Sequence, residues 1–184
     1  IPVTATDADQ VKVDAIEVGF DPLQLLFNRR LKLDITLVNL VGYIDQDAQG
    51  RWITTNIVLP EEPGVIAIDV DKVRLRSGNV SLKPFVENKK VSPKVVFSQL
   101  NGYGRFSDNY QVVGFEVGGQ PGRIGNVSVR GKVNLKNKAG NLQIQAADLL
   151  ASEVTPLVKL PVRLKGGKSN GNLRVKLPNE EEKE

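Results

Sequence analysis

Alternation of apolar and polar residues between Gly125 and Ala146 constrains the fold of this chain more than any other feature. A period of two residues is that of a β-strand with one apolar face and one solvated face. The polar segment Lys136–Asn141 interrupts the alternation and contains Gly and Asn, which tolerate turn conformations. The stretch therefore predicts a β-hairpin. Its apolar positions are Val127, Val129, Val133, Leu135, Leu142, Ile144 and Ala146.

The same period predicts strands along most of the chain, most regularly at Leu31–Leu37. A shift of parity at Ala15–Ile16 predicts a bulge, and Asp71–Lys72 shifts the phase of another strand. Ser77–Asn79 is predicted as a turn, and Asn101–Phe106 as a glycine-broken connection between strands.

Two short helices interrupt the strands. Asp21–Pro22 suits a helix start, because Asp caps the first turn and Pro lacks an N–H that would have no partner there. The helix is predicted to continue to Phe27. A second helix, or a pair of helices, is predicted over Asp148–Val158, where Pro156 ends or kinks it.

A short motif, Gly-Asn followed by apolar, polar, apolar and polar residues, occurs four times. Repeats of this kind are typical of strands that bury their apolar faces against neighbours, although Gly-Asn is also common turn chemistry. The spacing is irregular, which argues against a regular solenoid and favours an extended twisted sheet. The four copies lie at 78–83, 125–130, 140–145 and 171–176.

These patterns predict an all-β fold with two short helices. We expect an elongated, twisted antiparallel sheet that folds over into a hydrophobic groove, a β-taco-like arrangement. A closed β-sandwich is the alternative, and periodicity does not distinguish the two. Residues 1–177 are expected to form one β-groove domain, with a disordered acidic tail at 178–184.

Composition narrows the chemistry. The chain has no Cys, His or Met, which excludes disulfides, Cys/His metal sites and a His-based catalytic triad. No carboxylate pair suggests acid–base catalysis, so neither an enzyme nor a cofactor or metal site is expected. The net charge is +4, but Lys and Arg are spread over the polar parity of the strands rather than gathered in one stripe. We therefore expect a solvated strand face, or weak attraction to anionic headgroups, and no nucleic-acid binding.

Two stretches of the chain resemble the bacterial TamB/AsmA-like envelope protein family, in its cyanobacterial or chloroplast-type form. The first runs from Val13 through Leu31–Leu37 to Tyr43–Asp47 and Gly50–Trp52. The second is the pattern G-x-V-x-V-x-G-x-V-x-L…G-x-L-x-I-x-A-x-D-L, followed by L-P-V-x-L-x-G…G-N-L-x-V-x-L, within Gly125–Leu177.

The resemblance implies a fragment of a longer translocation and assembly module. It implies a segment of an envelope-spanning bridge that carries phospholipid between inner and outer membranes along an apolar β-groove. The expected partners are phospholipid acyl chains and an Omp85-family outer-membrane barrel, either TamA-like or a plastid import channel. The alternative is a structural scaffold for outer-membrane protein assembly or protein import, which binds client strands and transfers no lipid.

The implied location is the periplasm, with an inner-membrane anchor outside this fragment, or the intermembrane space of the chloroplast envelope. The residues expected to line the groove are the aliphatic side chains of the apolar parity. They are Leu31, Leu33, Ile35, Leu37, Ile66, Ile68, Val70, Val127, Val129, Val133, Leu135, Leu142, Ile144, Leu173, Val175 and Leu177.

Overall fold

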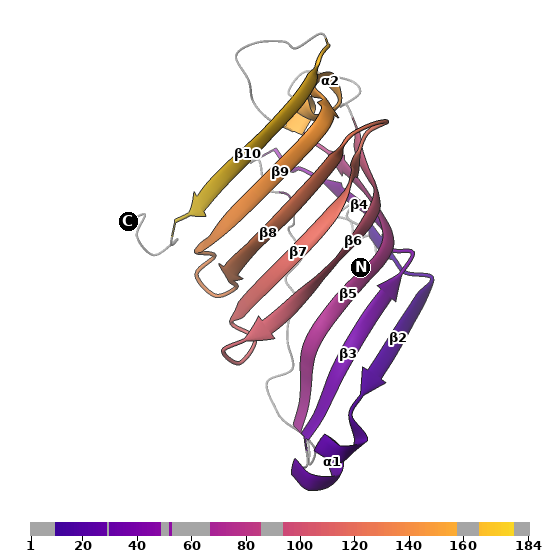
Figure 1. Cartoon of the computed structure of the whole chain (residues 1–184), viewed down its shortest axis with the longest axis vertical. Coiled ribbons are helices and arrows are strands. Elements are labelled where there is room, and N and C mark those ends of the chain that lie inside the picture. Colours follow the sequence, from indigo (N-terminus) through magenta and orange to yellow (C-terminus); the bar gives the residue numbers. More distant parts are fainter. Residues whose placement is uncertain are drawn as a thin grey trace.

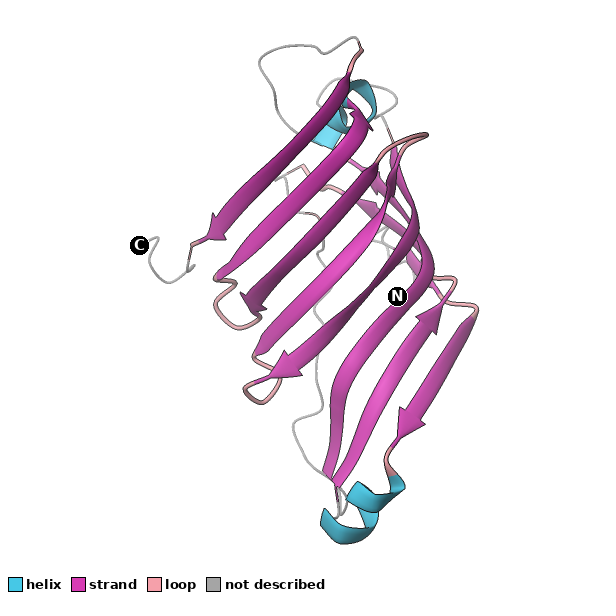
Figure 2. Ribbon diagram, in the orientation of Figure 1, coloured by secondary structure: helices cyan, strands magenta, loops and turns pink. Residues whose placement is uncertain are grey.

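The computed structural model describes residues 10–28, 30–48, 52, 67–85, 94–157 and 166–178. These residues form one open, twisted sheet of ten strands that does not close into a barrel (Figures 1 and 2). The strands are β1 (Gln10–Lys12), β2 (Ala15–Phe20), β3 (Arg30–Val38), β4 (Val41–Asp45), β5 (Ala67–Lys83), β6 (Val95–Ser107), β7 (Val112–Pro121), β8 (Asn126–Asn134), β9 (Gly140–Leu150) and β10 (Lys168–Leu177). The prediction of an all-β open sheet is confirmed, and the described strands do not form the two layers of a sandwich.

Strand β5 is the hub of the sheet. One edge of β5 pairs antiparallel with β6, and β6 to β10 continue as an antiparallel meander. The other edge of β5 pairs with β3 over its first part and with β4 over its second part, both in parallel. The prediction of a purely antiparallel sheet is therefore wrong at β5. Parallel pairing needs a long crossover, and residues 46–66 between β4 and β5 supply the length.

Two outer strands complete the sheet on this side. Strand β2 pairs antiparallel with β3, and β1 pairs antiparallel with β4. The interruption between strands β1 and β2 therefore lies opposite the interruption between strands β3 and β4. The predicted bulge at Ala15–Ile16 is in fact this break, at Val13–Asp14, where the Asp14 N–H still donates to the Val38 carbonyl at 3.2 Å.

The helices are short. Helix α1 (Pro22–Asn28) begins where the Asp21–Pro22 signal predicts, and Asp21 Oδ1 accepts the Leu23 N–H at 2.9 Å. Helix α2 (Ala151–Val154) leads into a 3₁₀ turn, η1 (Thr155–Leu157). The prediction of helix from Asp148 is wrong, because Leu149 and Leu150 pair with Ser169 and Lys168 of β10 and so extend β9.

A line of backbone irregularities crosses the sheet. Four non-glycine residues in or between successive strands have positive φ, a conformation that Asn and Asp tolerate best and most other residues adopt at a cost. Each lies beside a shift of strand register or a break between strands. We call this set the bulge line: Asn39 (φ 52°), Ser77 (57°), Gln99 (54°) and Asp148 (53°).

The bulge line replaces two of the predicted connections. Ser77–Asn79 is not a turn, because strand β5 continues through these residues and only forms a bulge there. The Gly-Asn motif at 78 therefore lies inside a strand. Asn101–Phe106 is likewise continuous strand within β6. Extra residues in a strand increase its twist and bend, so the line marks where the sheet turns.

Apart from Thr36 of β3, which is also buried, the buried side chains lie beyond the bulge line, at the end of the sheet near α2. The best-buried are Val95 at the start of β6, Pro121 at the end of β7 and Leu149 near the end of β9. Among the described hydrophobic residues other than proline, Val95 and Leu149 alone form the buried core. On the other side of the line the described residues form a single layer, whose strands contact mainly their hydrogen-bonded neighbours.

Candidate functional site: the apolar face of the sheet

One face of the sheet carries rows of apolar residues that run across the strands. Residues paired in register lie on the same face, so the pairing identifies each row directly. The first row crosses eight strands, from β2 to β10. Its members are Ile16, Leu37, Leu75, Gly102, Val117, Val129, Ile144 and Leu173.

A second row lies beside the first, two residues away along each strand. It crosses the same eight strands and contains one aromatic residue, Phe115, paired with a glycine on either side. With about 4.8 Å between neighbouring strands, each row is roughly 34 Å long. Its members are Val18, Ile35, Val73, Gly104, Phe115, Gly131, Leu142 and Val175.

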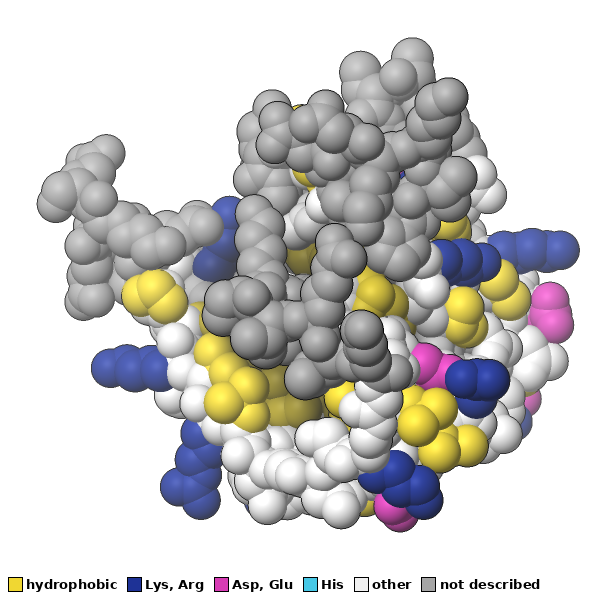
Figure 3. Space-filling view, turned by 90° about the horizontal axis from the view of Figure 1, so that it is seen from above, with side chains coloured by type: hydrophobic (Ala, Val, Ile, Leu, Met, Phe, Trp, Pro, Cys, Tyr) yellow, Lys and Arg dark blue, Asp and Glu magenta, His cyan; other side chains and the backbone are white. Residues whose placement is uncertain are grey.

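We call these two rows, together with the apolar residues that continue their parity, the apolar face. Several of its side chains are far more exposed than a core would allow. Ile16 is 62% exposed, Val18 54% and Leu173 56%. Figure 3 looks down on the molecule and shows yellow hydrophobic side chains gathered in a hollow, with dark blue Lys and Arg side chains projecting outward around it. A contiguous exposed apolar surface of this extent is typical of a binding site.

The predicted lining residues are found on this face wherever their strands are described. Leu31 to Leu37 line it from β3, and Val70 from β5. Ile68 is paired in the same strand, though only its backbone is described, and Ile66 lies outside the described residues.

The second half of the sheet holds the remaining predicted residues. All of them lie in strands except Leu135, which follows β8 in the hairpin turn and is 46% exposed. The others are Val127, Val129, Val133, Leu142, Ile144, Leu173, Val175 and Leu177.

The prediction missed several apolar members of the face, including Ile16 and Val18 on β2. Val73 and Leu75 continue β5 after its phase shift at Asp71, which the register confirms, since Leu33 pairs with Val70 and Asp34 with Lys72. Strand β7 contributes three more, although its alternation is clear, because Glu116 and Gln120 occupy the opposite parity. The residues missed in β7 are Val113, Phe115 and Val117.

A charged contact joins α2 to the sheet. Glu153 of α2 accepts the Arg123 backbone N–H at 2.8 Å and its Nε–H at 2.6 Å, which ties α2 to the turn between β7 and β8. The carboxylate sits over Gly122, where a side chain would collide with it. The Arg123 backbone N–H first, and then its guanidinium, hold the pKa of Glu153 below its usual range.

The opposite face, which we call the polar face, carries the charged parity of the same strands. In its β2–β5 part, charges are paired across strands. Arg76 donates to both carboxylate oxygens of Glu17 at 3.1 Å, and Arg74 Nη2 donates to Asp34 at 3.0 Å. These exposed pairs fix strand register more than they add stability.

Comparison of this chain with protein-family models, curated proteins and solved structures gives no significant match. The site therefore has to be interpreted from its own geometry.

Two further observations concern the described residues. None of their helices is long and apolar enough to span a membrane. Nor do they include a cluster of three or more carboxylate side chains placed to hold a metal ion. What these residues do offer is a broad aliphatic surface, suited to apolar ligands.

Proposed function

We propose that the apolar face binds the acyl chains of phospholipids. The observation that carries this proposal is the pair of apolar rows crossing eight strands, whose side chains are exposed on the edge strand β2 and at Leu173 of the edge strand β10, and half-buried on the strands between them. On this proposal the chain is one segment of a bridge that moves phospholipid between the inner and outer membranes. The bridge, its envelope location and its Omp85-type partner rest on the resemblance described above.

The physical basis is the transfer of hydrocarbon out of water. Each methylene of an acyl chain that enters an aliphatic groove gains about 0.8 kcal/mol, while the headgroup stays solvated at the open side. The first row presents Val, Leu or Ile on every strand except β6, and the second row does so on every strand except β6, β7 and β8, so most neighbouring positions offer similar surfaces. A lipid can therefore shift along the rows without crossing a large energy barrier.

The second candidate is a scaffold that pairs with strands of client proteins. It is favoured by the edge strand β10, whose ten residues are almost all exposed and pair only with β9 among the described strands. An extended segment can add to such an edge through backbone hydrogen bonds. Lys and Arg side chains along β10, however, are a common protection of sheet edges against unwanted pairing.

Native mass spectrometry of the protein purified from bacteria tests the lipid proposal. We expect mass increments of phospholipid on the wild-type chain, and transfer of fluorescent phospholipid between liposomes. Val129→Asp and Ile35→Asp place a charge on the apolar face, and both should abolish the increments. Ser128→Asp, on the polar face next to Val129, is the matched control and should retain them.

Circular dichroism of each variant separates a binding defect from a folding defect. The proposal predicts that Val129→Asp and Ile35→Asp keep the β-sheet spectrum of the wild type. A wild-type chain that carries no lipid and transfers none contradicts the proposal. Unfolding of both apolar-face variants contradicts it too, since the face would then be a closed core.

A further inference from the structure

The β6–β10 part of the polar face carries five cations on three alternate strands. Arg105 lies on β6, Arg130 and Lys132 on β8, and Arg174 and Lys176 on β10. The strands between them contribute neutral or acidic groups, of which Glu116 on β7 is the one acid that lines the same surface. We call these five cations the basic plate.

Cross-strand pairing places the five residues side by side. Lys132 and Lys176 both pair with Asn141, on either side of β9, and Arg130 and Arg174 both pair with Gln143. Arg105 pairs with Gly114, which in turn pairs with Lys132. The cations therefore form two adjacent rows across a width of about 19 Å, given the usual strand spacing.

None of the five cations forms an ion pair with a described residue, in contrast to the β2–β5 part of the same face. Arg130 is the most constrained, since its Nε and Nη2 both donate to the neutral Gln143 Oε1, at 3.0 and 2.8 Å. All five side chains are exposed. Their positive charge is thus available to a partner.

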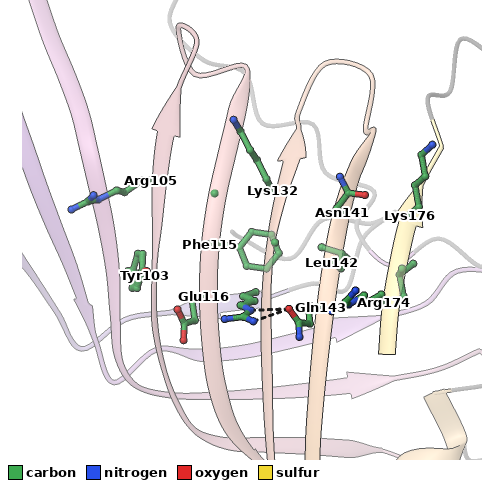
Figure 4. Close-up of a pocket in the computed structure, with 14 residues that line it drawn as sticks. Tyr103, Arg105, Phe115, Glu116, Lys132, Asn141, Leu142, Gln143, Arg174 and Lys176 are labelled. Carbon is green, nitrogen blue, oxygen red and sulfur yellow. Dashed lines mark hydrogen bonds between the residues drawn. The ribbon is translucent and has the colours of Figure 1, made fainter. Parts of the chain in front are cut away.

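The surface between these side chains is hollowed. An open depression of about 780 Å³ lies over β6–β10 and is lined by all five cations together with Tyr103, Asn141 and Gln143. Figure 4 shows Arg105 at one side of it and Arg174 and Lys176 at the other, with Lys132 between them. The polar face therefore has both the charge and the space for several anionic groups at once.

We propose that the basic plate docks the chain on the surface of an anionic phospholipid bilayer. A bilayer presents phosphates over a broad, nearly flat area, which matches five cations spread across the width from β6 to β10. Each Lys or Arg near such a surface strengthens the attraction, and the attraction falls with salt. A nucleic acid fits less well, because it favours a continuous basic stripe with stacking aromatics, and Tyr103 is the one aromatic residue that lines the polar side of the depression.

This docking proposal does not depend on lipid binding by the apolar face, which is the opposite face of the sheet. A chain whose basic plate rests on a headgroup layer holds its apolar face away from that layer. The two surfaces together allow the chain to associate with a membrane without inserting its aliphatic rows.

Vesicle co-sedimentation of the wild-type protein tests the docking. The protein should bind vesicles of equimolar phosphatidylcholine and phosphatidylglycerol, but not vesicles of phosphatidylcholine alone. Binding should fall steeply as salt is raised, because the screening length shrinks to about 3 Å at 1 M. This comparison needs no variant and so does not depend on the folding of one.

Variants then locate the surface. The triple variant Lys132→Gln, Arg174→Gln, Lys176→Gln should lower the partition coefficient roughly 100-fold. Each cation near the surface strengthens membrane binding about fivefold, and the variant removes three of them. The control triple Lys12→Gln, Lys32→Gln, Lys94→Gln removes the same charge from exposed positions elsewhere and should lower it by much less. Circular dichroism checks that both triples fold.

Four outcomes overturn the inference: equal binding to both vesicle types, no binding to either, equal losses in the two triple variants, or binding of an oligonucleotide in place of vesicles. A failure of this docking proposal can be told apart from a failure of the proposal that the apolar face binds lipid. Basic-plate variants should keep their phospholipid increments in native mass spectra, and Val129→Asp should keep its binding to anionic vesicles.

Discussion

The Asn101 side chain holds the bulge of the neighbouring strand, because its Oδ1 accepts the backbone N–H of Ser77 at 3.1 Å. The Nδ2 of the same amide donates to the Gln99 carbonyl at 2.8 Å. One side chain thus satisfies backbone groups beside two members of the bulge line, in β5 and in β6. The turn of the sheet toward its buried end depends on such local contacts, because few core side chains are there to impose it.

Replacing Asn101 should therefore destabilise the fold. We expect Asn101→Ala to lower the free energy of unfolding by about 1–2 kcal/mol, as two backbone groups lose their partner. Asn172→Ala, on the exposed edge strand β10, should change it by less than about 0.5 kcal/mol. Urea denaturation followed by circular dichroism measures both. Equal effects of the two substitutions would show that Asn101 does not support the bulges.

Gln99 tests the backbone strain of the bulge line directly. Its φ of 54° is costly for a β-branched residue and free for glycine. Gln99→Val should lower the free energy of unfolding by about 1–2 kcal/mol, whereas Gln99→Gly should leave it near the wild-type value. Gln145→Val, in a regular part of β9, serves as the control and should be close to neutral. A harmless Gln99→Val would mean that the residue is not held at positive φ.

Close strand packing at Gly102 gives a third prediction. A Cβ there would collide with the Glu116 carbonyl oxygen and lie 2.7 Å from the Val117 Cα. Gly102→Ala should therefore destabilise the protein by about 1–3 kcal/mol, since backbone has to move. Gly114→Ala, whose nearest neighbour would be a carbonyl oxygen at 4.0 Å, is the matched control. Thermal unfolding of the two variants should differ clearly, and coincident curves would contradict the strand packing described.

The contact between Arg123 and Glu153 should respond to pH. Because the pKa of Glu153 is lowered in the folded state, the stabilisation it gives is complete above the ordinary pKa of a glutamic acid. The stabilisation is lost as the pH falls through the lowered pKa. The stability difference between wild type and Glu153→Gln should therefore be largest near about pH 6 and shrink toward about pH 3. A difference that is constant over this range would exclude the carboxylate as its source.

The sequence predicts the strands well where their two parities differ in polarity. The predicted strand at Leu31–Leu37 and the predicted β8–β9 hairpin are confirmed. There the alternation of apolar and polar residues identifies both the strand and the side of it that is apolar. In the hairpin turn, Asn134 Oδ1 accepts the N–H groups of Lys136 and Asn137, which explains the sharp reversal after β8. Helix α1 is confirmed for a similar local reason, its Asp21–Pro22 start.

What the sequence does not show is how distant strands pair. Nothing local indicates that β5 runs parallel to β3 and β4, since this depends on a long crossover. Bulges such as that at Ser77 also look like turns in the sequence, because Gly and Asn serve both. For the Lys and Arg residues the sequence predicts a solvated face or weak attraction to anionic headgroups, but it does not predict the basic plate, since the five cations come together only through the register of β6 to β10.

The central claim is that the apolar face holds lipid, and site-specific photocrosslinking tests it most directly. The chain has no native cysteine, so a single Cys at either of two neighbouring positions on β9 can carry a benzophenone. Ile144 lies on the apolar face, and Gln145 lies on the polar face. Irradiation with vesicles of phosphatidylcholine alone, to which the basic plate should not bind, should crosslink lipid to the probe at Ile144→Cys and much less at Gln145→Cys. Equal crosslinking at both positions, or none at Ile144→Cys, would contradict the account.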